Sequence, residues 1–145
     1  MQPSKTILIV DHDHAMLINI ARHIQSIGYG TILATDAAEA ISAVRHSNPN
    51  LILLNVDFPP DVAHGGGPFS DGFLLLIWLR QMDEAKTVPI VMINGDDSPA
   101  HIDRARTAGA AGYFPKPINF DGLMAMIVGK VGEPIPQAQE TSPSA

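Results

Sequence analysis

Several side chains that could take part in chemistry stand at or just beyond the ends of short apolar runs. They are Asp11, His12, Asp13, Asn55, Asp57, Asn94, Tyr113 and Lys116. Carboxylates and imidazoles can bind a cation or move a proton, and a lysine can hold an anion such as a phosphoryl group. What these residues do together depends on whether the fold brings them to one place.

The apolar runs predict the strands of a parallel sheet. They are apolar throughout rather than alternating, as in strands that helices cover on both faces. They span residues 6–10, 31–34, 51–54, 89–93 and 112–114.

Stretches with helical apolar spacing lie between these runs, and capping residues mark their ends. Asp13 can cap a helix that stops at Gly28, and Asp36 with Glu39 resembles a capping box for the next helix. Later helices are expected at residues 73–82, from Ser98-Pro99, and from Asn119 or Asp121 to about residue 131. Strands that alternate with helices indicate an α/β fold, in which ligands bind beyond the carboxyl ends of the strands.

Composition limits the class of protein. The 145 residues, of which 46% are hydrophobic, suit one domain at residues 1–131, and the Pro- and Ser-rich tail at 132–145 is expected to be flexible. The net charge of −6 argues against binding to nucleic acid. There is no cysteine, and no apolar run is long enough for a membrane span or a signal peptide, so we expect a cytoplasmic protein that does not contact a membrane.

The strand-end residues belong to an ordered set of motifs. They read ILIVDHD at residues 7–13, LLNVDFP at 53–59, DG at 71–72, PIVMIN at 89–94 and YFPKP at 113–117. Each motif alone is weak, but their order and spacing over residues 5–131 resemble the receiver domains of response regulators in two-component (phosphorelay) signalling. The resemblance implies a flavodoxin-like, doubly wound fold, with a five-stranded parallel sheet in the order 2-1-3-4-5 and five helices.

The resemblance also assigns roles to residues. In the family, an aspartate at the end of the third strand accepts a phosphoryl group from a histidine kinase, and two acids after the first strand help to bind Mg²⁺. A hydroxyl residue and a lysine hold the phosphoryl oxygens. By position, Asp11 matches the first acid, Tyr113 the switch aromatic, Lys116 the lysine and Pro117 the proline whose peptide bond is cis.

Other positions depart from the family pattern. His12 replaces the second acid, Asn55 the acceptor aspartate and Asn94 the hydroxyl residue. An acyl phosphate needs an ionised carboxylate as nucleophile, and Mg²⁺ prefers oxygen ligands to imidazole. We therefore predict a pseudo-receiver that is not an enzyme, with no cofactor, at most weak Mg²⁺ binding through Asp11, and a pocket in which Asp11 could pair with Lys116.

The predicted function is that of a stand-alone receiver-like domain that acts by protein–protein contact without phosphorylation. Its expected partner is a histidine kinase or a downstream effector, bound on the face of the fourth helix, fifth strand and fifth helix around Tyr113. Two alternatives remain. Asp57 could accept the phosphoryl group instead, because residues 55 and 57 of an extended chain face the same way. Asp11, His12 and Asn55 could also bind a metal or a small ligand.

Two further segments carry weaker signals. Residues 61–70 look like a glycine-rich insertion, which we interpret as a surface loop rather than a lid anchored by Phe69. The apolar stripe that follows is wider than one buried face requires, so its excess could mark a partner surface. It consists of Phe73, Leu74, Leu76, Ile77 and Trp78.

Overall fold

The computed structural model describes residues 5–55, 72–94 and 99–134, and it contains a five-stranded parallel sheet in the order β2-β1-β3-β4-β5. The strands are β1 (Thr6–Val10), β2 (Gly30–Ala34), β3 (Leu51–Asn55), β4 (Ile90–Asn94) and β5 (Gly112–Pro115). The predicted fold class and strand order are confirmed, and each predicted run lies within about one residue of its strand, the usual uncertainty of such boundaries.

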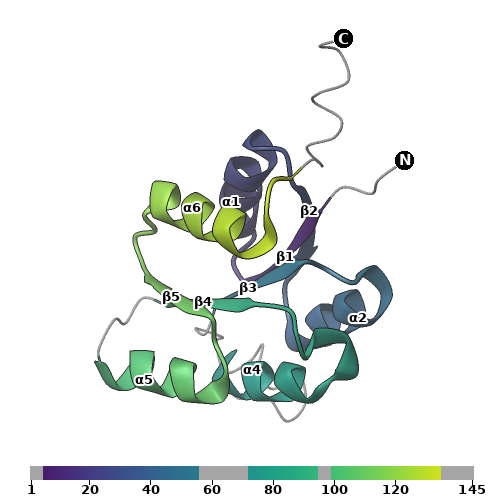
Figure 1. Cartoon of the computed structure of the whole chain (residues 1–145), viewed down its shortest axis with the longest axis vertical. Helices are drawn as coiled ribbons and strands as arrows, with labels where there is room; N and C mark the ends of the chain where they lie inside the picture. The colour runs from purple at the N-terminus through teal and green to yellow at the C-terminus, as the bar shows by residue number, and fades with distance from the viewer. Residues whose placement is uncertain (1–4, 56–71, 95–98, 135–145) are drawn as a thin grey trace.

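Helices cover both faces of the sheet (Figure 1). The α-helices of the described ranges are α1 (His14–Ser26), α2 (Ala37–Ser47), α4 (Gly72–Gln81), α5 (Pro99–Ala108) and α6 (Phe120–Val131), and a short 3₁₀-helix, η1, spans Asp83–Ala85. One face is covered by α1 and α6, and the other by α2, α4 and α5. None of the helices described is long and apolar enough to span a bilayer.

The two faces explain why the strands are apolar at every position. Successive side chains of a strand point to opposite faces. In β1, Ile7 and Ile9 pack with α1 and α6, whereas Leu8 and Val10 pack with α2 and α4. Because helices cover both faces, Ile7 to Val10 of β1 and all of β3 are buried and show no polar alternation, whereas the edge strands β2 and β5 are partly exposed.

Side-chain caps begin three of the helices, as predicted. Asp13 Oδ1 accepts hydrogen bonds from the amides of Ala15 (2.9 Å) and Met16 (3.3 Å) and so caps α1. Of the two candidates for α6, the structure selects Asn119, whose Oδ1 accepts from the amide of Gly122 at 3.1 Å. These bonds satisfy amides that have no partner within the helix.

The start of α2 contains a variant of the predicted capping box. Asp36 Oδ1 accepts from the amide of Glu39 at 2.8 Å, as expected. The return bond goes one residue further back, because Glu39 Oε1 accepts from the amide (2.7 Å) and the hydroxyl (2.8 Å) of Thr35. These two bonds stabilise the carboxylate and lower the pKa of Glu39.

The end of α6 is hydrogen-bonded to residues just before β1 and β2, at the amino ends of these strands. The Tyr29 hydroxyl donates to the carbonyl of Gly132 at 2.6 Å, and Lys5 Nζ donates to the carbonyl of Val131 at 2.5 Å. Contacts of the domain thus reach slightly past the predicted boundary at residue 131. The insertion at 61–70, Ser98 and the tail from residue 135 lie outside the described ranges.

Candidate functional site

The site is built on two neighbouring strands at the carboxyl edge of the sheet. Val10 of β1 is in register with Leu54 of β3, so Asp11 and Asn55 follow side by side. The amide of Asp11 donates to the carbonyl of Ala34 at 3.1 Å, which continues the pairing with β2. Alternation along the strands directs both side chains to the α1 and α6 side. Each residue is only 1% exposed, and they are the buried polar residues of the described ranges.

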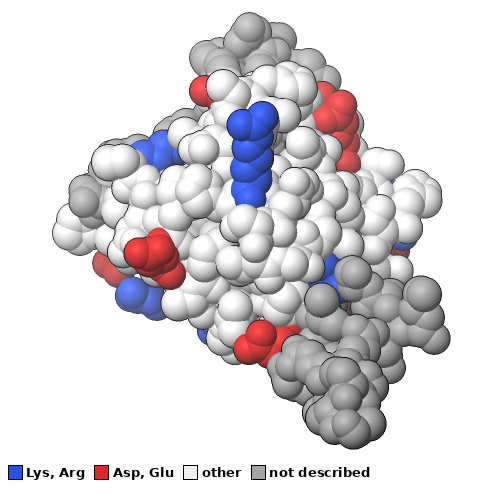
Figure 2. Space-filling view, turned by 90° about the horizontal axis from the view of Figure 1, so that it is seen from above, with Lys and Arg blue, Asp and Glu red and all other residues white. Residues whose placement is uncertain are grey.

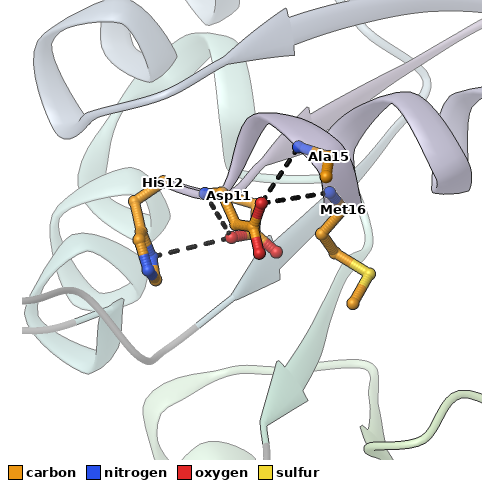
Figure 3. Close-up of polar contacts among 5 residues, drawn as sticks. Asp11, His12, Ala15 and Met16 are labelled. Carbon is orange, nitrogen blue, oxygen red and sulfur yellow. Dashed lines mark hydrogen bonds and ion pairs between the residues drawn. The ribbon is translucent and has the colours of Figure 1, made fainter.

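One oxygen of the Asp11 carboxylate is engaged by its own loop. Oδ1 accepts a hydrogen bond from the amide of Asp13 at 2.9 Å (Figure 3). Oδ2 is buried and has no hydrogen-bond partner among the residues described. A buried carboxylate oxygen is normally satisfied by a donor, a water or a cation. Asp11 is therefore the residue at which a positively charged group or a donor would gain most.

His12 lies next to this carboxylate. Its Nδ1 is 3.6 Å from Asp11 Oδ1, and its side chain is 31% exposed (Figure 3). This distance is too long for a hydrogen bond, so the two side chains attract each other only when the imidazole is protonated. Asp13 accepts hydrogen bonds from the amides at the start of α1 instead and serves as a cap, as predicted.

Lys116 and Pro117 follow β5, at the same edge of the sheet as Asp11. The Lys116–Pro117 peptide bond is cis, which confirms the prediction for Pro117. The possible ion pair between Asp11 and Lys116 is not formed among the residues described, and Asp11 lies beside His12 instead. Oδ1 of the carboxylate is held by the amide of Asp13 in its own loop.

Two other predicted site residues are Asn94 and Asp57. Asn94 is the last residue of β4, in register with Pro115, at the same edge of the sheet as Asn55. The conformation of its side chain, and all of Asp57, lie outside what the structure describes. The prediction that Asp57 faces the same way as Asn55 stays a prediction.

Tyr113 lies on β5, where the switch aromatic was expected. Its half-buried side chain packs against the core on the side of α2, α4 and α5. It also lines a small hollow of about 130 Å³ between α5 and β5, together with Ile102 and Ala105. The side chain therefore connects the core to the outer surface of the sheet edge.

The residues at the metal position do not suit Mg²⁺. Mg²⁺ is normally held by carboxylates and waters in octahedral geometry. Here the donors at the matched positions are one carboxylate, one imidazole and one amide, from Asp11, His12 and Asn55. Within the ranges described, no group of three or more His, Asp or Glu residues is placed to hold a metal ion.

Sequence reasoning missed one well-connected side chain, Arg80 of α4. Its guanidinium donates to the carbonyls of Ala85 (3.1 Å), Lys86 (2.9 Å) and Val88, in the connection between α4 and β4. Burial lowers the pKa of Arg80 from its usual value. No local pattern signals this role, because main-chain carbonyls of any residue can accept the bonds.

The order of the strands, the two helical layers and the polar site at the carboxyl edge define a CheY-like, flavodoxin-type fold. The model of the response regulator receiver domain matches residues 7–128. This chain therefore belongs to the response regulator receiver domain family of two-component signalling.

Individual relatives share the fold at modest identity. The chain is 24% identical to the polar-differentiation response regulator DivK of Brucella anthropi, over 89% of this chain and 98% of that protein. It is 28% identical to the response regulator MprA of Mycobacterium sp. (strain KMS), over 95% of this chain but only 55% of MprA. A CheY-like receiver domain structure from Methanospirillum hungatei JF-1 has a TM-score of 0.76 at 27% identity, covering 90% of this chain and 96% of that one.

Proposed function

We propose that this receiver domain transmits its signal without accepting a phosphoryl group. The observation that carries the proposal is Asn55, which ends β3 at the position of the acceptor aspartate. Its carboxamide is neutral and supplies no anionic oxygen to attack phosphorus. The residue is 1% exposed, so its side chain is enclosed at the end of β3.

The rest of the pocket supports the same proposal. Phosphoryl transfer to a receiver requires a metal ion to neutralise the developing charge. In place of the second acid of the family stands His12, so Asp11 is the single carboxylate at the matched metal positions. We infer that the domain needs no cofactor, that Mg²⁺ binds weakly at best, and that the domain has no catalytic activity of its own.

The proposed activity is binding to another signalling protein, a histidine kinase or a downstream effector in the cytoplasm. The face formed by α5, β5 and α6 corresponds to the face of the fourth helix, fifth strand and fifth helix in the receiver family. Tyr113 lies on it, half-buried above the hollow between α5 and β5. A domain that cannot be switched by phosphate would present one conformation of this face, so its partner would bind constitutively.

Incubation with acetyl phosphate and Mg²⁺, followed by intact-mass spectrometry, tests the proposal. We expect no phosphoryl adduct on the wild-type chain. Asn55→Asp restores the carboxylate and, treated in parallel, tests whether Asn55 alone blocks the reaction or the rest of the pocket blocks it as well. A stable adduct on the wild type would refute the proposal, and its mapping to Asp57 would establish the substitute acceptor.

A further inference from the structure

Two large apolar side chains of α4 face outward. Leu75, Leu76 and Leu79 of this helix are fully buried in the core. Ile77 and Trp78 lie on the other side of the helix and are 41% and 45% exposed. Adjacent outward apolar residues of this size are unusual on a free surface and often mark a binding site.

Hollows lie on either side of these residues. A groove of about 560 Å³ runs between α4 and α5, and a second hollow of about 240 Å³ lies beside Trp78 towards α2. Gln81 lines both, so they form one continuous surface, which we call the α4–α5 groove. Its residues are Arg45, Ile77, Trp78, Arg80, Gln81, Met82, Ala100, Asp103, Arg104, Thr107 and Ala108.

The charge of this groove is opposite to that of the chain. The described residues that line it include Arg45, Arg80 and Arg104 and one acid, Asp103, which is itself paired with Arg106 at 3.3 Å. The guanidinium of Arg80 is bound to main-chain carbonyls. The whole chain has a net charge of −6. In contrast to the groove, the face seen from above, on the side of α1 and α6, carries scattered charged residues of both signs (Figure 2).

We propose that the α4–α5 groove binds an acidic amphipathic helix of a partner protein. A groove between two packed helices fits the ridge of side chains along a third helix. The apolar side of that helix would cover Ile77 and Trp78, and its acidic flanks would meet Arg45 and Arg104. Aromatic residues with arginines beside them are the residue types that contribute most to such interfaces.

A second copy of this chain fits the groove less well. Most pairs of identical chains associate about a two-fold axis, which brings a surface against itself. Arg45 and Arg104 of one copy would then face those of the other, and two chains of net charge −6 would also repel each other. The proposal does not depend on the chemistry at Asn55, and the groove is separate from the surface around Tyr113.

Trp78 is the only tryptophan of the chain and reports directly on the groove. The probe is a peptide of roughly 18 residues with Leu at helical i, i+3, i+4, i+7 spacing and Glu on its flanks. A second peptide keeps every Leu and carries Lys in place of Glu. We expect the Glu peptide to shift Trp78 emission to shorter wavelength and to bind at least about tenfold more tightly than the Lys peptide.

Variants identify the contact surface by anisotropy of the labelled Glu peptide. Trp78→Ser and Arg104→Glu should each weaken binding about tenfold. Both residues are exposed, and retained circular dichroism verifies folding. Ile18→Ser is the matched control, because Ile18 is 42% exposed on α1, on the opposite face of the sheet, and its binding should stay within about twofold.

Four results would overturn the proposal. The Glu peptide could fail to bind, the Lys peptide could bind equally well, or Ile18→Ser could weaken binding as much as Trp78→Ser. If gel filtration shows that Trp78→Ser converts a dimer to a monomer, the occupant is a second copy and the proposal is wrong. None of these results affects the acetyl phosphate test, so failure of one proposal is distinguishable from failure of the other.

Discussion

Asn55→Asp would place a second carboxylate beside the buried carboxylate of Asp11. The two residues follow the register pair Val10 and Leu54, and neighbouring strands lie about 4.8 Å apart. Two charges about 5 Å apart repel each other by about 3 kcal/mol at an effective dielectric constant of about 20. Both positions are 1% exposed, and Lys116 forms no ion pair with Asp11 that could offset the repulsion.

The expected result is a lower melting temperature without divalent metal. For a domain of this size, 1 kcal/mol corresponds to about 4 °C, so the variant should melt roughly 10 °C below the wild type near neutral pH. One carboxyl of the pair can take up a proton, because a neighbouring negative charge raises its folded pKa above the unfolded value. The variant should therefore be closest to the wild type below about pH 4 and lose stability as pH rises through the raised pKa.

Scanning calorimetry in EDTA at several pH values measures both effects. Asn19→Asp is the matched control, because it makes the same chemical change at an exposed position of α1 and should shift the melting temperature by only about 1–2 °C. Added Mg²⁺ should recover much of the loss in Asn55→Asp and little in the control. An unchanged or higher melting temperature for Asn55→Asp in EDTA would refute the assignment of Asp11 and Asn55 to one pocket.

Other predictions concern the tertiary contacts of Arg80 and Tyr29. Arg80→Met should lower the free energy of unfolding by about 2–4 kcal/mol in urea titrations, because three carbonyls lose their charged donor. Arg106→Met loses only an exposed ion pair and should change the free energy of unfolding by less than about 1 kcal/mol. Equal effects of the two substitutions would contradict the role of Arg80. Tyr29→Phe should cost about 1 kcal/mol near neutral pH through loss of the bond to Gly132. Burial, with a smaller effect of Glu133, raises the pKa of Tyr29 above its usual 10.0, so the wild-type advantage is complete below about pH 10 and is lost as pH rises through the folded value. Alkaline melting curves that keep a constant difference between the two proteins would show that the Tyr29 hydroxyl is not buried.

The sequence by itself determined the order of elements and the residue type at position 55. Strands apolar at every position, with Asp13 and Asp36 as caps after two of them, are local signals that survive in any packing of the chain. The lack of an acceptor carboxylate at position 55 is a property of the residue type and needs no coordinates. The cis bond before Pro117 was also predictable, but through the resemblance rather than through any local physical signal.

Only the tertiary structure decided which side chains meet. The sequence placed Asp11 and Lys116 at the same edge of the sheet, but in the described structure Asp11 lies beside His12 and forms no ion pair with Lys116. It also flagged an apolar excess after residue 72, yet it could not show that Trp78 lies beside Arg45. These residues come from α4 and α2, and their position around one hollow depends on how two helices distant in sequence pack on one face of the sheet.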